Sequence, residues 1–222
     1  MGESIFPVNF ESIIKRYQIV DQRKYQIDCI EEIVSNLNDG NDVLIDLPTG
    51  TGKTLIFAPI VTEISEKGGN ALVLIATKNA QRRVGVEIKK FEKEKKHVLV
   101  YGIGEYNCPI LGGKANNWDC KELKEEVCKL QNIDCEVINS EKNLSFSNLV
   151  VTNFSKFLLS PINRDFDLIV LDDSHGFENT KDQIYQITIL FGESRILYEN
   201  RTLPESLQKM VEDFLNLFAL DF

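Results

Sequence analysis

Short runs of apolar residues recur along the chain and are separated by longer, more polar stretches. They are Val43–Asp46, Ala71–Ala76, Val98–Tyr101, Leu149–Thr152 and Leu168–Leu171. Continuous runs of this length are typical of strands buried on both faces of a parallel sheet. Between them, Gln22–Leu37 carries apolar residues at mostly helical spacing, and Leu55–Lys67 is compatible with a helix. The alternation predicts an α/β fold with a mainly parallel sheet.

A glycine-rich segment with a Lys-Thr pair, Asp46–Thr54, follows the first apolar run. Gly50 and Gly52 let the backbone turn and present its N–H groups to the β- and γ-phosphates of a nucleotide. Lys53 adds a positive charge, and the Thr54 hydroxyl can bind Mg²⁺. The strict pattern has a glycine at position 47, where this chain has leucine, but the predicted strand and helix on either side restore the context. The segment therefore predicts a phosphate-binding loop for a nucleoside triphosphate.

A second nucleotide signal lies where the apolar run Leu168–Leu171 ends in two carboxylates. Asp172 at the strand end would hold Mg²⁺, directly or through water, and Asp173 would orient the water that attacks the γ-phosphate. His175 would couple the state of the nucleotide to neighbouring elements. The alternative is that both aspartates only end a strand in a turn. Their combination with Lys53 favours a site that hydrolyses a nucleoside triphosphate.

Composition places the chain in a broad class. Its 222 residues are 43% hydrophobic and 27% charged, which suits one large domain or one domain with an insertion. No apolar stretch reaches the length of about 18 residues that a membrane span needs, and the N-terminus lacks signal-peptide character. We expect a cytoplasmic protein without membrane contacts. Despite the net charge of −9, the segment 78–96 is basic, and it is either a solvated helix face or a contact to a nucleic-acid strand.

These motifs resemble those of superfamily 2 helicases of the DEAD/DEAH type, and among them the XPD/DinG-like iron-sulfur DNA helicases. Arg23–Gln26 resembles the R-x-Y-Q element, Pro48–Thr54 motif I, Ala76–Gln81 motif Ia, and Asp172–His175 the Asp-Glu-Ala-His box. The resemblance covers most of the chain and implies a RecA-like, doubly wound sheet. It implies an ATP-binding set of Arg23, Gln26, Pro48, Thr49, Gly50, Thr51, Gly52, Lys53 and Thr54, with Gln26 as the adenine reader. Thr77 and nearby amides would grip a phosphate of single-stranded DNA.

The aspartate at position 173 departs from the family, which has glutamate there. Its carboxylate is one methylene shorter, so it would position water less well, and hydrolysis is expected to be slow or absent. ATP binding should survive, because Lys53, Thr54 and Asp172 supply most of the complementary charge.

The second part of the resemblance lies in a cysteine-containing segment. Gly102–Cys108 resembles the G-R-x-N-Y-x-C element that opens the cluster domain of the iron-sulfur helicases, with Ile103 in place of the arginine, and Val150–Phe154 resembles the strand that returns from it. The candidate ligands are Cys108, Cys120, Cys128 and Cys135, which are spaced more widely than in the family. They would hold a [4Fe-4S] cluster, hold Zn²⁺, or stay unligated. Cys29 has the spacing of a core residue, and Trp118 would anchor the segment or stack on a base.

The expected organisation is a RecA-like ATP-binding domain in 1–105 and 147–180, a cysteine-containing insertion in 106–146, and a helical segment in 181–222 that would begin a further domain. Helicases of this class close ATP between two RecA-like domains. The resemblance therefore implies a motor domain that needs a second RecA-like domain, in cis or in trans, and that binds single-stranded nucleic acid, with DNA favoured. The alternative is a helicase-derived regulatory or interaction module that binds nucleotide with little or no hydrolysis.

Overall fold

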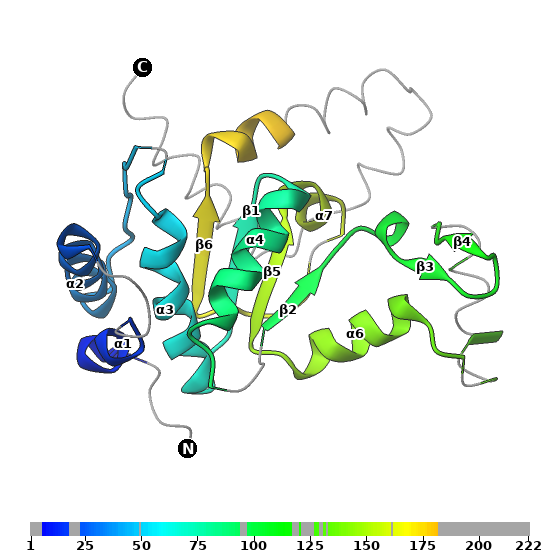
Figure 1. Ribbon diagram of the computed structural model, residues 1–222, viewed down its shortest axis with the longest axis horizontal. Helices are drawn as coiled ribbons and strands as arrows, with labels where there is room; N and C mark the ends of the chain where they lie inside the picture. The colour runs from blue at the N-terminus through cyan, green and yellow to red at the C-terminus, as the bar shows by residue number, and fades with distance from the viewer. Residues whose placement is uncertain are drawn as a thin grey trace.

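The structure is a computed structural model that describes residues 6–17, 23–48, 50–93, 97–116, 120, 127–128, 131, 133–160 and 162–181. Its centre is a four-stranded parallel sheet with the strand order β2-β5-β1-β6 (Figure 1). The strands are β1 (Ala71–Ile75), β2 (His97–Val100), β5 (Leu149–Asn153) and β6 (Leu168–Asp172). Four of the five predicted strands are therefore confirmed, and so is the parallel sheet.

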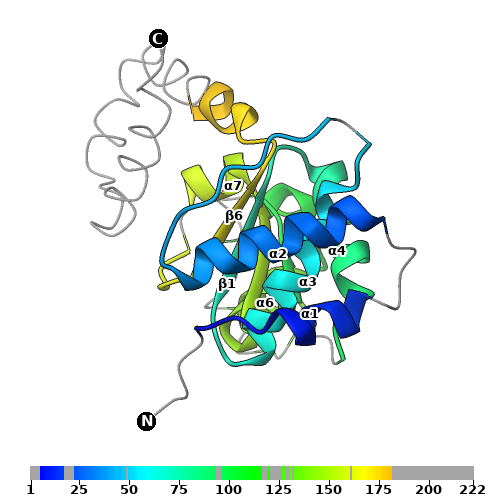
Figure 2. The same ribbon diagram turned by 90° about the vertical axis from the view of Figure 1, so that its left-hand side faces the viewer.

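Helices cover both faces of this sheet. They are α1 (Phe10–Tyr17), α2 (Lys24–Asn38), α3 (Lys53–Glu66), α4 (Lys78–Lys89), α6 (Glu136–Phe146) and α7 (Phe154–Leu159). Alternate residues of β1 point to opposite faces. Val73 packs in the core with α1 to α4, and Leu72 packs in a second core with Phe154 and Phe157 of α7. Figure 2 looks from the side on which α1 and α2 lie. This two-sided packing confirms the RecA-like, doubly wound architecture.

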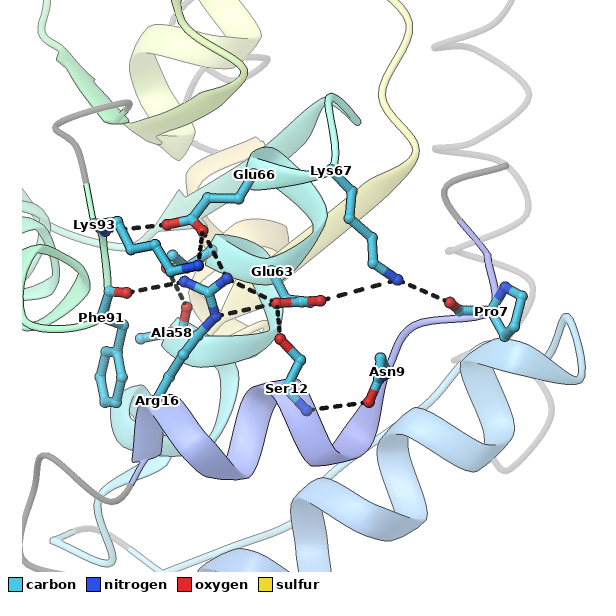
Figure 3. Close-up of polar contacts among 11 residues, drawn as sticks. Pro7, Asn9, Ser12, Arg16, Ala58, Glu63, Glu66, Lys67, Phe91 and Lys93 are labelled. Carbon is cyan, nitrogen blue, oxygen red and sulfur yellow. Dashed lines mark hydrogen bonds and ion pairs between the residues drawn. The ribbon is translucent and has the colours of Figure 1, made fainter. Parts of the chain in front are cut away.

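Helix α1 is fastened to α3 by a buried ion network (Figure 3). The Arg16 guanidinium lies 2.9 Å from the Glu63 carboxylate and 2.6 Å from the Glu66 carboxylate. Its Nη1 also donates to the main-chain carbonyl of Phe91 at 3.3 Å, and the Ser12 hydroxyl donates to Glu63 at 2.8 Å. Because buried charges are tolerated only when they are paired and hydrogen-bonded, this network fixes α1 against the helix that follows the glycine-rich loop.

The strand predicted at Val43–Asp46 does not form, and this prediction was wrong. These residues are neither helical nor paired in a sheet, and Leu44 is 77% exposed. Within the described part of the chain, β6 lies at the edge of the sheet, and residues 41–48 run outside it. Only Val43 and the following Leu47 pack against the core. The run is short and is flanked by aspartates, so its apolar side chains alone do not hold it against β6.

The segment after β2 leaves the sheet and returns through α6. It contains a 3-10 turn, η1 (Ile103–Glu105), and a two-stranded antiparallel sheet of β3 (Asn107–Cys108) and β4 (Gly113–Lys114). In Figure 1 this small sheet stands apart from the main one. Trp118, most of residues 121–130 and residues 182–222 lie outside the described residues. Among the described residues, no helix is long and apolar enough to cross a membrane.

Candidate nucleotide-binding site and cysteine cluster

The glycine-rich loop ends at the N-terminus of α3. Gly50 and Gly52 have φ angles of 83° and 84°, in the left-handed region that glycine adopts without strain. Gly52 is the N-cap of α3, and Lys53 and Thr54 form its first turn. The free N–H groups of a helix N-terminus favour an anion. The loop therefore has the local geometry of a phosphate site, although Thr49 lies outside the described residues.

The R-x-Y-Q element contacts this loop directly. The Gln26 side chain is 1% exposed, and its Nε2 donates to the main-chain carbonyl of Thr51 at 2.8 Å. Its Oε1 accepts from the Arg23 amide at 3.3 Å, at the start of α2. The Tyr25 hydroxyl donates to the same Thr51 carbonyl, and the Thr51 hydroxyl donates to the carbonyl of Pro48 at 2.8 Å. Gln26 thus braces the loop, and its role as an adenine reader stays a prediction.

The structure brings the two carboxylates at the end of β6 close to this loop. The Asp173 carboxylate lies 3.9 Å from the Lys53 ammonium. Burial raises the pKa of Asp172 above its ordinary value, the adjacent Asp173 raises it further, and Lys53 and Arg83 act in the opposite direction. The Asp172 carboxylate is thus half-buried and interacts electrostatically with Lys53 of the glycine-rich loop. Carboxylate and hydroxyl oxygens are ligands that Mg²⁺ accepts, so the chemistry of Asp172 and Thr54 fits this ion.

Asp173 has a φ of 55°, which places a residue other than glycine in the left-handed region. Aspartate and asparagine tolerate this region better than other residues with a side chain. The Asp173 carbonyl accepts from the Gly176 amide at 2.8 Å, and His175 is exposed at the start of the helical residues 175–181. The turn is held on the core by Phe177, which packs edge-on against Phe154 with ring centroids 5.2 Å apart.

Gln81 is a residue whose importance the sequence did not indicate. Its buried Nε2 donates to the carbonyls of Val100 and Val151 at 3.0 and 2.9 Å, and its Oε1 accepts from Asn153 at 3.3 Å. It ties α4 to the ends of β2 and β5. Thr77 caps α4 by accepting from the Ala80 amide at 3.2 Å. Gln81 belongs to the Ala76–Gln81 element, which was expected to contact a nucleic-acid strand. Nothing in the sequence indicated that its side chain is buried.

The four candidate cysteine ligands converge in one buried cluster. Their exposed fractions are Cys108 6%, Cys120 7%, Cys128 3% and Cys135 3%, and none forms a disulfide. They pack together with Ala115 and Val137. Burial raises the pKa of the Cys128 thiol, and its neighbours Cys135 and Cys108 raise it further. Among the described residues, no group of three or more metal-binding side chains is arranged to hold an ion. The donor set suits four-cysteine ligation, but ligation stays a prediction. Cys29 packs at the main core, as expected.

Comparison with known proteins decides the family. Residues 19–199, which include both nucleotide motifs, match the family described as type III restriction enzyme, res subunit. The chain belongs to this family. The match to the res-subunit family also contains the R-x-Y-Q element and the whole cysteine segment.

Relatives of this res-subunit domain carry helicase names. The chain is 23% identical to a probable ATP-dependent helicase of Methanocaldococcus jannaschii over 78% of its length and 31% of the relative. It is 31% identical to an ATP-dependent rRNA helicase of Encephalitozoon cuniculi over 60% of the chain and 28% of the relative. It is 25% identical to a DEAD-box ATP-dependent RNA helicase of Helicobacter pylori over 83% of the chain and 34% of the relative.

The chain spans about a third of the length of these curated relatives. Together with the res-subunit family, they support an N-terminal domain of a superfamily 2 helicase. They do not distinguish the XPD/DinG-like subfamily, because two of these relatives are named RNA helicases.

Proposed function

We propose that the chain is the ATP-binding motor domain of a helicase, which hydrolyses ATP when it engages single-stranded nucleic acid and a second RecA-like domain. The observation that carries this proposal is the meeting of two distant motifs, with Lys53 and Asp173 separated by 3.9 Å. The RecA-like domain would comprise residues 1–105 and 147–180, with 106–146 as an insertion and 181–222 as the start of a further segment. We place its activity in the cytoplasm.

Each residue of the site has a part in this proposal. The loop amides and Lys53 would bind the β- and γ-phosphates, and Thr54 and Asp172 would hold Mg²⁺, which neutralises charge on the phosphates. Asp173 would orient the attacking water, and His175 would relay the nucleotide state. Gln26 and Arg23 would hold the loop in shape and, with Pro48, Thr49, Gly50, Thr51 and Gly52, line the nucleotide. A second domain would supply the charge that stabilises the leaving phosphate.

A nucleotide titration tests the first part of this proposal. Lys53→Ala should weaken MgATP binding by about 10- to 100-fold, the value of a charge-assisted hydrogen bond. Asp172→Asn should weaken binding with Mg²⁺ but much less without it. Lys90→Ala is the matched control, because Lys90 is exposed, lies at the C-terminal end of α4 and pairs with Glu87 of that helix. Equal affinity of the wild type and Lys53→Ala for MgATP would refute the site.

Turnover tests the second part. We expect ATP hydrolysis to rise when the isolated chain is joined to a second RecA-like domain and single-stranded nucleic acid is added. Nucleotide binding without turnover under those conditions would favour the alternative, a regulatory or interaction module that uses ATP as a switch. That alternative is supported by Asp173, because the residue is shorter than the family's glutamate and lies in a left-handed turn with φ 55°.

We further propose that the four buried cysteines hold a [4Fe-4S] cluster and that the strand is DNA, as in the helicases that the cysteine segment resembles. The support is the convergence of four thiols, none of them in a disulfide, on one core. Protein purified without oxygen should absorb in the visible range and contain about four irons per chain. It should also bind a DNA oligonucleotide more tightly than the RNA of the same sequence. Zinc without iron, or preference for RNA, would overturn this finer assignment and leave the motor domain standing.

A further inference from the structure

Three cationic side chains gather around one carboxylate beside the main sheet. Lys78 and Arg82 come from α4, and Lys114 comes from β4 of the segment that carries the cysteines. Lys78 Nζ bonds the Glu105 carboxylate, and Arg82 Nη2 lies 3.7 Å from it. Lys114 Nζ donates to the main-chain carbonyl of Glu105 at 2.8 Å. Two segments that are separated in the sequence therefore both place cations at Glu105.

Several cations act on the one carboxylate of Glu105. The hydrogen bond from Lys78 lowers the pKa of Glu105 most, slight burial opposes it, and the charges of Lys78, Lys114 and Arg82 lower it further. Three positive charges thus act on Glu105, and one of them, that of Lys114, also acts on the Glu136 carboxylate. By contrast, Glu87, toward the other end of α4, pairs with Lys90 at 2.7 Å. The Glu105 carboxylate offers two oxygens and one charge, as does the phosphodiester of a nucleic acid.

Stability alone does not account for the arrangement. The side chains of Lys78 and Arg82 are 53% and 60% exposed, and ion pairs this exposed contribute little to folding. An aromatic ring adjoins the cations, since the Arg82 guanidinium lies 5.8 Å from the centroid of the Tyr101 ring. Sites for single strands combine cations along the backbone with aromatic rings on which bases stack.

We propose that Lys78, Arg82 and Lys114 form a binding site for a phosphate of single-stranded nucleic acid, which Glu105 occupies until the strand displaces it. This inference rests on the proposed function, because it takes a nucleic-acid strand as the ligand. It goes further in giving the cysteine-bearing segment, through Lys114, a direct contact to the strand. Glu105 then sets the affinity, because the strand must displace the carboxylate from the cations.

The test uses fluorescence anisotropy with labelled oligo-dT and oligo-U at several salt concentrations. Glu105→Gln should bind about three- to tenfold tighter than the wild type at low salt, because a competing charge is removed. The matched control is Glu87→Gln, which changes the net charge equally and starts from a side chain that is 29% exposed against 28% for Glu105. It should change affinity less than about twofold.

Lys114→Ala identifies the site more sharply. It should lower the slope of log affinity against log salt by about 0.7, the loss of one phosphate contact on a single strand. In the Lys114→Ala background, Glu105→Gln should gain less than it gains alone, because the two residues share the site. Urea unfolding checks that the variants are folded. Glu105→Asp keeps the charge on a shorter side chain, so its affinity for the oligonucleotide should lie between those of the wild type and Glu105→Gln.

The outcomes separate the inference from the function on which it rests. If Glu105→Gln binds no more tightly than Glu87→Gln, or its gain is undiminished by Lys114→Ala, the site is wrong while strand binding by the wild type stands. If the wild type binds MgATP but neither oligonucleotide, strand engagement fails and the inference fails with it.

Discussion

Arg16→Ala tests whether α1 is held by buried charge. The Glu63 side chain is only 5% exposed and would lose its main partner. Removing one member of a buried ion pair costs about 3–5 kcal/mol, because the other charge stays buried. Two groups remain near Glu63, the Ser12 hydroxyl at 2.8 Å and Lys67 at 3.9 Å. We therefore expect the lower end, about 3 kcal/mol of unfolding free energy.

Urea unfolding followed by circular dichroism measures this effect. With a slope of about 2 kcal/mol per M, the midpoint should fall by about 1.5 M. Lys90→Ala, at an exposed pair on α4's C-terminal side, should change stability by less than about 0.5 kcal/mol. An Arg16→Ala midpoint equal to that of Lys90→Ala would refute the reasoning, since it would mean that water reaches Glu63.

The same network predicts a pH dependence. Burial acts to raise the pKa of Glu66, but the Arg16 hydrogen bond, the Lys93 amide and both charges outweigh it, and the folded pKa lies below the ordinary value. Glu66 therefore contributes stability that is fully present above its unfolded pKa and is lost as pH falls through the folded pKa. Arg16→Ala should reduce this acid-dependent loss, which unfolding midpoints between about pH 3 and 6 would reveal.

Three further predictions follow from close contacts. Gly52→Ala should weaken MgATP binding and cost about 1–2 kcal/mol, because its Cβ would lie 2.5 Å from Gln26 Nε2 at a φ of 84°; unchanged affinity in a nucleotide titration would contradict this. Gln81→Leu should cost about 2–3 kcal/mol in urea unfolding by leaving buried carbonyls unpaired, and a neutral result would mean that water replaces the amide. Gly85→Ala should cost about 1–3 kcal/mol, because its Cβ would lie 2.8 Å from Leu99; a double variant with Leu99→Ala should be more stable than the summed single effects, and strict additivity would refute the contact.

The sequence predicted the strands well where burial alone defines them. The run at Ala71–Ala76 became the central strand β1, buried along its whole length. The run at Val43–Asp46 looked similar but did not pair. The difference lies in the neighbours, since β1 pairs with both β5 and β6, whereas an edge position offers a single partner. Apolar composition indicates that a segment can be buried, but it does not say whether a strand edge is available to it.

Polar partners were harder to predict than strands. The motifs predicted that Lys53 and Asp172 would share a site, because a phosphate-binding loop and a carboxylate at a strand end together bind the nucleotide phosphates and Mg²⁺. No motif linked Arg16 to Glu63 or Glu105 to Lys114, since such pairs depend on how helices and loops pack in three dimensions. The four cysteines were partly predictable. The resemblance indicated which cysteines are candidate ligands, but only the fold shows that these widely spaced thiols share one core.

The aspartate at position 173 takes on a different meaning once its backbone is known. In the sequence, this aspartate replaces the glutamate of the family. Its side chain is one methylene shorter, which predicts that it positions water less well. In the structure it has a φ of 55°, a conformation that aspartate adopts with less strain than glutamate. The residue and the turn therefore suit each other, and the reach of the carboxylate depends on both. Because the Asp173 carboxylate already lies 3.9 Å from the Lys53 ammonium, the left-handed turn, and not the side-chain length alone, decides how near it comes to the phosphate loop.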